Sequence, residues 1–133
     1  MRLSVRGDEY DLDCDLLDAS PEAVRTQVAE YERGERRAFD LPVSFPAGLT
    51  GEVMRAMVEI PYGETRTYGE IAAELDTAAQ PVGGACGRNP LPVVVPCHRV
   101  VAADGLGGFS AAAGVDAKRR LLAFERGESL DAF

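Results

Sequence analysis

Residues 93–100 read Val-Val-Val-Pro-Cys-His-Arg-Val, and the other motifs of the chain lie on either side of them. The β-branched run 93–95 is typical of a buried strand. Pro96 has no N–H to give to a strand ladder, so we expect the strand to end or bend there. The next residues are Cys97 and His98, the only histidine in the chain. A thiol and an imidazole should therefore lie where a strand leaves the core, either as plain structure or as a nucleophile with its base.

The composition predicts a single globular domain, or one domain with a small appendage. The chain has 133 residues, of which 46% are hydrophobic, and this proportion suits a packed core. We expect a cytoplasmic protein without a membrane partner, because the sequence has neither a long apolar stretch nor a signal-peptide segment. Three scattered cysteines favour a reducing compartment. One histidine and no Cys-x-x-Cys pair predict that no metal is bound.

The net charge of −8 points away from nucleic acid at first sight. However, residues 1–46 carry 6 basic and 11 acidic side chains, whereas residues 79–133 carry 6 and 5. The acidic side chains thus lie mostly outside the segment that holds the motifs. They are either an ordinary solvated face or an acidic surface adapted to a salty cytoplasm. High salt would also weaken the part of DNA binding that comes from counterion release.

Local signals in the first part of the chain predict a small mixed module. An edge strand is expected at Leu3 and Val5, which alternate with polar residues, and the acidic stretch 8–18 is expected to form a turn followed by a second short strand. The triplet 20–22, Ser-Pro-Glu, is typical of a helix start, with a serine cap and an acidic first turn. The polar run 35–37 marks a boundary. We therefore expect an N-terminal α/β module over residues 1–38 and a second domain over residues 39–133.

The second domain is predicted to be mainly helical. A helix capped by Thr50 should run to about residue 59. Thr67 and Glu70 form a capping box that opens a helix over residues 68–75, and a further helix is expected over residues 79–87. Two short helices joined by a tight turn are a helix-turn-helix candidate, although any helical hairpin gives a similar pattern.

The end of the chain adds a loop and one more helix. Residues 103–114 are rich in glycine and alanine. They form either a flexible loop or a loop whose backbone closes over a small flat ligand. The last helix is expected over residues 116–126, with Gly127 ending it.

Several of these stretches carry a family likeness by their order and spacing. They are Thr67–Ala72, Val82–Ala85, Asn89–Pro92, Pro96–Val100 and Gly105–Ser110, followed by Lys118, Leu121, Leu122 and Glu125. Over residues 39–127 the chain resembles the O6-alkylguanine-DNA alkyltransferases, or methylated-DNA–protein-cysteine methyltransferases. The resemblance implies an α+β fold in which a small mixed N-terminal module precedes a mainly helical, winged-helix-like domain that binds DNA. It also implies a DNA repair protein that transfers a methyl or alkyl group from O6 of guanine to its own cysteine, once per molecule and without a cofactor.

The resemblance also implies catalytic roles for five residues. Cys97 would be the acceptor. Because a neutral thiol is a poor nucleophile, His98 would take its proton through a water molecule, supported by Glu125. Asn89 would hold the turn before the cysteine, and Tyr68 would donate a hydrogen bond to the leaving guanine. By itself, Glu125 would be an ordinary charge on an amphipathic helix, and Tyr68 would be a tyrosine on the buried face of a helix.

Binding residues follow from the same resemblance. The substrate-binding residues would be Tyr68, Val100, Phe109 and Ser110. The DNA-binding residues would be Thr67, Ala78, Ala79, Gln80, Gly83 and Arg88. Gln80 departs from the family, which has an arginine there that fills the place of the flipped base, so base flipping is the step in question. Gln80 could instead form a capping box with Thr77.

The expected partner is double-stranded DNA containing O6-alkylguanine, bound by a monomer. One alternative is a non-catalytic alkyltransferase-like binder of alkylated DNA that recruits repair proteins. Relatives of that kind replace the acceptor cysteine, whereas Cys97 is present here. A further alternative is a regulator that uses its helix-turn-helix without lesion chemistry. That alternative leaves Tyr68, His98 and Glu125 unexplained.

Overall fold

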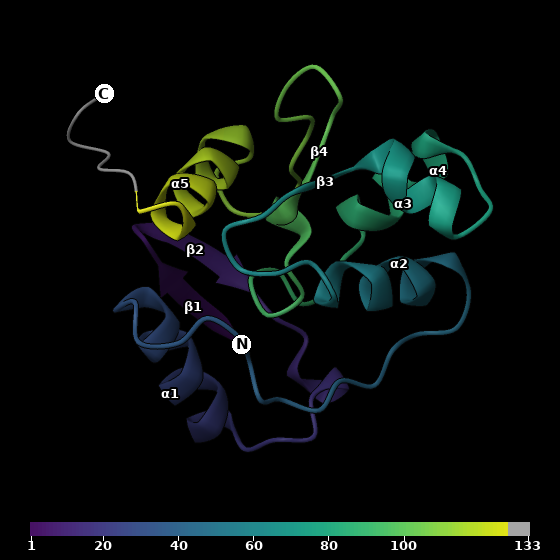
Figure 1. The fold of residues 1–133 in the computed structure, drawn as a ribbon. Helices are drawn as coiled ribbons and strands as arrows, with labels where there is room; N and C mark the ends of the chain where they lie inside the picture. Colours follow the sequence, from purple (N-terminus) through teal and green to yellow (C-terminus); the bar gives the residue numbers. More distant parts are fainter. Residues whose placement is uncertain (128–133) are drawn as a thin grey trace.

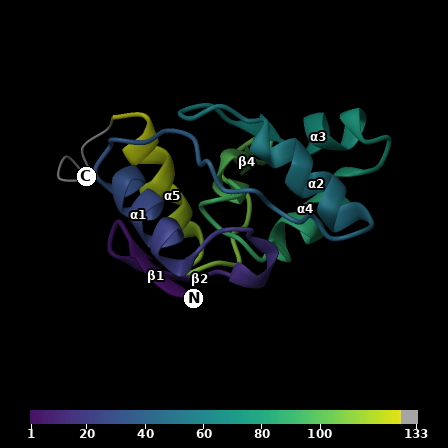
Figure 2. The same ribbon diagram turned by 90° about the horizontal axis from the view of Figure 1, so that it is seen from below.

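The computed structural model describes residues 1–127. Its helices and strands fall into two groups, separated by a pair of very short strands (Figure 1). The N-terminal hairpin, α1 and α5 lie together, and α2, α3 and α4 lie together at the other end of the molecule, as the second view also shows (Figure 2). In chain order, the elements are β1 (Arg2–Val5), β2 (Asp8–Asp11), the 3₁₀ turn η1 (Cys14–Leu16), α1 (Pro21–Glu32), α2 (Leu49–Val58), β3 (Arg66–Thr67), α3 (Tyr68–Glu74), α4 (Ala79–Gly87), the 3₁₀ turn η2 (Cys97–Arg99), β4 (Val100–Val101) and α5 (Val115–Glu125).

The N-terminal elements follow the local signals of the sequence. Strands β1 and β2 pair antiparallel through a two-residue turn, Arg6 and Gly7, which has φ of 51° and 86°. Positive φ at both turn residues is the geometry that suits the twist of a hairpin. The N–H of Ala23 donates to Ser20 Oγ at 3.1 Å. The predicted first strand and the predicted helix start are therefore confirmed. The second strand begins at Asp8, where a turn was expected, because Arg6 and Gly7 already form the turn.

Helix α2 begins in a way that the sequence did not reveal. Its N-cap is Gly48 with φ 84° rather than Thr50. The Oγ1 atom of Thr50 instead accepts a bond from Arg88 Nε at 3.3 Å. A Cβ on Gly51 would lie 1.7 Å from the carbonyl oxygen of Pro46, so the preceding chain crosses the first turn of the helix closely. The predicted Thr50 cap is wrong because this tertiary packing sets the helix start.

Helices α3 and α4 form the predicted hairpin. Glu70 N–H donates to Thr67 Oγ1 at 3.1 Å, and Thr67 N–H donates to Glu70 Oε1 at 2.8 Å, so the capping box is confirmed. The turn between the helices passes through Asp76, with φ 53°. The N-cap of α4 is Ala78, which makes no side-chain cap bond. The alternative capping box between Thr77 and Gln80 is therefore wrong.

The buried valine run before the cysteine is a turn and not a strand. Val93 has φ 74°, and the N–H of Val95 donates to the carbonyl of Leu91 at 2.8 Å. Pro92 and Pro96 flank the three valines and give no N–H to a strand ladder. The segment between them is therefore too short to pair as a strand. Cys97 then lies in η2, and β4 begins only at Val100, which pairs in parallel with Arg66 of β3. The prediction of a strand over residues 93–95 is wrong for this reason.

One hydrophobic core joins the two predicted units. It contains Val5, Val24 and Val28 from the N-terminal segment together with Val53 and Leu121 from the rest of the chain, among others. At the edge of this core, Arg120 Nε and Nη2 of α5 donate to the carboxylate of Asp8 in β2 at 2.7 and 2.8 Å. Within the described residues, no helix is long and apolar enough to cross a bilayer.

Candidate active site

Cys97 lines a pocket of about 340 Å³ at the junction of α3, α4 and η2. This volume lies in the range of small-ligand sites. The pocket is lined by Tyr68, Gln80, Gly83, Cys86, Gly87, Cys97, Gly108, Phe109 and Ser110. Six of these residues were expected from the sequence to bind or react, and they come from four separate stretches of chain. The fold therefore brings the expected acceptor Cys97, the expected guanine contact Tyr68 and the glycine-rich loop to one cavity.

The thiol of Cys97 is only 5% exposed, at the floor of this pocket. Burial raises its pKa above the ordinary value, against the opposing effects of a hydrogen bond from the Asn89 side chain and of the Lys118 charge. The thiol is therefore protonated at neutral pH. Because the thiolate is the reactive form, this cysteine needs a base at hand to act as a nucleophile.

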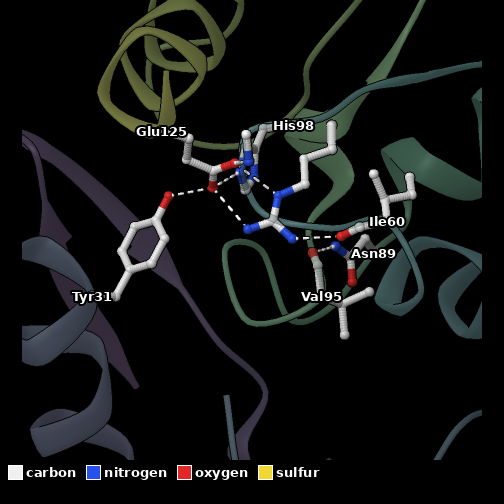
Figure 3. Close-up of polar contacts among 8 residues, drawn as sticks. Tyr31, Ile60, Asn89, Val95, His98 and Glu125 are labelled. Carbon is white, nitrogen blue, oxygen red and sulfur yellow. Dashed lines mark hydrogen bonds and ion pairs between the residues drawn. The ribbon is translucent and has the colours of Figure 1, made fainter. Parts of the chain in front are cut away.

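His98 is fully buried behind Cys97 and is held by a carboxylate. Its Nε2 lies 2.6 Å from Glu125 Oε2. Arg99 clamps the same carboxylate, with Nε 2.8 Å from Oε1 and Nη2 2.9 Å from Oε2 (Figure 3). Although burial raises the pKa of Glu125, the hydrogen bonds and charges of His98 and Arg99 hold it well below its ordinary value. Glu125 is thus ionised at neutral pH.

The ionised carboxylate fixes the tautomer of His98. A carboxylate only accepts hydrogen bonds, so His98 Nε2 must carry the proton and Nδ1 must carry the free lone pair. Nδ1 is buried and receives no hydrogen bond from any residue among 1–127. Burial lowers the pKa of His98, and the charges of Arg99 and Lys118 lower it further against the raising effect of Glu125. His98 is therefore neutral at neutral pH, with a base at Nδ1.

Tyr68 forms the opposite wall of the pocket. Its hydroxyl lies 3.4 Å from the Gly108 carbonyl oxygen and 3.4 Å from Lys118 Nζ. Lys118 is fully buried, and its Nζ also donates to the carbonyls of Val100 at 2.6 Å and Gly108 at 3.1 Å. Gly107 has φ 73°, and a Cβ there would lie 2.7 Å from the Tyr68 ring, so only glycine fits. Burial raises the pKa of Tyr68, so the phenol stays a neutral donor.

Asn89 shapes the turn that presents the cysteine. Its Nδ2 donates to the carbonyl of Val95 at 2.8 Å, and its Oδ1 accepts from the N–H of Leu91 at 3.0 Å. These two bonds close the proline-rich turn ahead of Cys97. Figure 3 shows the bond from Asn89 to Val95 beside the Glu125 cluster.

Other residues expected at the site lie outside the pocket. The Val100 side chain is fully buried, and its carbonyl serves Lys118. Thr67 caps α3 and Arg88 contacts Thr50. Ala78 and Ala79 are exposed at the start of α4, next to the pocket residues Gln80 and Gly83.

Sequence reasoning assigned no role to Arg99, Lys118 or Tyr31. Arg99 is a charged residue within an apolar stretch, and that signal could have marked it, whereas Lys118 is followed by two arginines and gives no such signal. Nothing in the local sequence links Tyr31 of α1 to the site. Cys86 also lines the pocket, where its Sγ lies 3.7 Å from Met57 Sδ and burial raises its pKa to about 12.

The fold and pocket are those of a mixed α/β protein that presents one buried cysteine, with a neutral histidine behind it, to a small ligand. A family model described as "6-O-methylguanine DNA methyltransferase, DNA binding domain" matches residues 49–127. A methylated-DNA–protein-cysteine methyltransferase of Methanopyrus kandleri is 45% identical over 105 residues, which cover 77% of this chain and 79% of that protein. The chain therefore belongs to the O6-methylguanine DNA methyltransferase family.

Further comparisons agree with this membership. A methylated-DNA–protein-cysteine methyltransferase of Mycolicibacterium paratuberculosis is 46% identical over 107 residues, covering 77% of this chain. The present chain spans only 64% of the length of that relative. A crystal structure of Mycobacterium tuberculosis OGT in complex with DNA aligns with a TM-score of 0.75 and 38% identity, over 84% of this chain and 71% of that one.

Proposed function

We propose that this protein repairs DNA by transferring a methyl or other alkyl group from O6 of guanine to Cys97. The observation that carries the proposal is the arrangement at the pocket floor. A protonated thiol faces the cavity, and the adjacent imidazole is neutral, with Nε2 held by Glu125 at 2.6 Å. Family membership supports the same reaction.

The proposed reaction moves one alkyl group and one proton. His98 Nδ1 takes the thiol proton, with a water molecule as relay, and the Cys97 sulfur attacks the alkyl carbon. An S–C bond forms as the C–O6 bond breaks, and the electron pair stays on guanine. Tyr68 donates a hydrogen bond to the leaving base, which finally holds the proton that the thiol lost. Cys97 remains a thioether, so each molecule reacts once.

We propose that the DNA lies against the α3–α4 hairpin, acting as the helix-turn-helix of a winged-helix-like domain over residues 39–133. A flipped O6-alkylguanine would enter between Tyr68 and the loop that carries Phe109 and Ser110. The exposed residues Ala78, Ala79 and Gln80 at the start of α4 would meet the duplex around it, together with the partly buried Gly83. Thr67 and Arg88 flank them. We propose that the protein acts as a cytoplasmic monomer.

Intact-mass measurement tests this function. Wild type incubated with a duplex containing one O6-methylguanine should gain the mass of one CH₂ and then stop. Cys97→Ala should gain nothing, while Cys86→Ala should react like wild type, because the base His98 adjoins Cys97 in the chain and not Cys86. If wild type binds the lesion duplex tightly yet never gains mass, the protein is a non-catalytic binder of alkylated DNA and the proposal fails.

A further inference from the structure

Tyr31 reaches the catalytic carboxylate from the N-terminal helix α1. Its hydroxyl donates to Glu125 Oε2 at 2.6 Å, across 94 residues of sequence (Figure 3). The tyrosine is fully buried. The same oxygen, Oε2, is the one that His98 Nε2 approaches at 2.6 Å. A phenol of the N-terminal segment and the expected base thus share one acceptor atom.

The ring of Tyr31 is held so firmly that its hydroxyl has a fixed direction. Its centroid lies 5.6 Å from those of Phe39 and Phe124 and 6.1 Å from that of Tyr62, with Phe124 and Tyr62 edge-on. Tyr62 belongs to the same aromatic cluster but lies half-buried, and its hydroxyl makes no hydrogen bond within residues 1–127. The cluster therefore contains one hydroxyl directed at Glu125 and one that is not.

The groups around the Glu125 carboxylate determine how the Tyr31 hydroxyl affects His98. Glu125 is faced by Tyr31 from α1, by Arg99 and His98 from η2, and by the Gly63 N–H at 3.2 Å from the loop after α2. Tyr62 is also close enough to Glu125 for the carboxylate charge to add to the effect of burial in raising the pKa of Tyr62. Apart from Glu125, the charged groups that face His98 are Arg99 and Lys118, and both oppose its protonation. Every donor to Glu125 draws negative charge from the carboxylate that would stabilise a protonated His98, and Tyr31 does so at Oε2 itself.

We propose that Tyr31 is a positioning residue for the transfer reaction, holding Glu125 in place and limiting the proton affinity of His98. The N-terminal segment would then complete the site rather than only cover it. This inference rests on the proposed function, because the base that Tyr31 tunes is the one that the reaction uses.

Removing the hydroxyl should make His98 easier to protonate. In Tyr31→Phe, Oε2 keeps more negative charge and attracts the proton of an imidazolium more strongly. The pKa of His98 should rise by about one pH unit, a tenfold change in proton affinity. Because a protonated imidazole cannot accept the thiol proton, transfer should slow in acid and approach the wild-type rate as the pH rises toward neutral.

The single histidine of the chain makes this measurable without assignment. We would label the full chain with ¹⁵N-histidine and titrate wild type, Tyr31→Phe and the matched control Tyr62→Phe by NMR. The proposal expects a higher His98 pKa in Tyr31→Phe alone. Replacing Tyr31 by 3-fluorotyrosine, a stronger donor that keeps the hydroxyl, should lower the His98 pKa. This variant carries the test if Tyr31→Phe does not fold.

Transfer rates at several pH values complete the test. The acidic limb of the rate profile should move to higher pH in Tyr31→Phe and stay in place in Tyr62→Phe. An unchanged His98 pKa in Tyr31→Phe and in the fluorotyrosine variant, or an equal rate loss at every pH, would overturn the proposal and leave Tyr31 a packing residue. The NMR titration needs no transfer, so a wild type that never alkylates would refute the proposed function without deciding the role of Tyr31.

Discussion

Glu125 of α5 is the residue at which α1, the loop after α2 and η2 meet. It accepts hydrogen bonds from Tyr31, Gly63, His98 and Arg99. A buried charge is tolerated only when its partners are in place, so the carboxylate fixes the position of each donor. The orientation of His98 and its Nε2–H tautomer follow directly from this arrangement.

His98→Ala should slow alkyl transfer by roughly 10²–10⁴, the usual contribution of a general base. The loss should shrink as the pH rises, because hydroxide then removes the thiol proton. Burial raises the pKa of Cys97, so recovery should begin only above the ordinary thiol value of about 8.5. Single-turnover rates across pH check this, and a loss that is the same at every pH would contradict it.

Glu125→Gln should destabilise the fold at neutral pH by roughly 3–5 kcal/mol, because Arg99 would stay buried without its counter-charge. The folded pKa of Glu125 lies below the unfolded value of about 4.3. Its stabilising contribution is therefore full above that value and is lost as the pH falls through the folded pKa. Denaturant unfolding of wild type and Glu125→Gln should differ most near neutral pH, and the difference should narrow in acid. The exposed Glu64→Gln serves as the control, and a difference that does not change with pH would contradict this account.

At the scale of elements, prediction succeeded where structure is local. The capping box of Thr67 and Glu70 fixes the start of α3 from four residues of sequence, and the bounds of α4 were predicted equally well. The turn over residues 93–95 was missed because its shape depends on Asn89 and on flanking prolines, which a count of β-branched residues ignores. The Thr50 cap failed because the chain at Pro46 crosses the helix start.

Gln80→Arg should strengthen duplex binding and speed repair of a lesion in duplex DNA. Gln80 is exposed in the first turn of α4 and lines the pocket, so an arginine there would add a charge near phosphates and a planar group for the emptied stack. We expect a gain of about 1–2 kcal/mol in binding that shrinks as salt rises.

Reaction with free O6-alkylguanine base is the control, since it needs no flipping and should be unchanged by Gln80→Arg. Duplex binding measured over a salt series, together with both rates, distinguishes the outcomes. If neither rate changes, position 80 plays no part in opening the duplex.

At the scale of the whole molecule, the N-terminal segment and the rest of the chain share one core and several hydrogen bonds between distant residues. Tyr31 reaches Glu125, and Asp8 pairs with Arg120. Polar composition alone predicted a boundary near residue 38. It could not show that α5 packs beside α1, because no local pattern encodes which distant element covers an apolar face.

The shared core predicts that the full chain unfolds in one cooperative transition. Far-UV circular dichroism, which reports mainly the helices, should give the same midpoint as tyrosine fluorescence, which reports Tyr10 and Tyr31 in the N-terminal segment and Tyr62 and Tyr68 beyond it. Two separated transitions would show instead that residues 1–38 and the remainder are independent units.

The most direct test of the central claim is to locate the alkyl group after reaction with O6-methylguanine duplex. Trypsin should release residues 89–99, which contain Cys97 and His98, apart from residues 67–88, which contain Cys86. Fragmentation of the first peptide should place one methyl on Cys97 in every reacted molecule. A methyl on His98 or Cys86, or no methyl on protein that has consumed the lesion, would contradict the account.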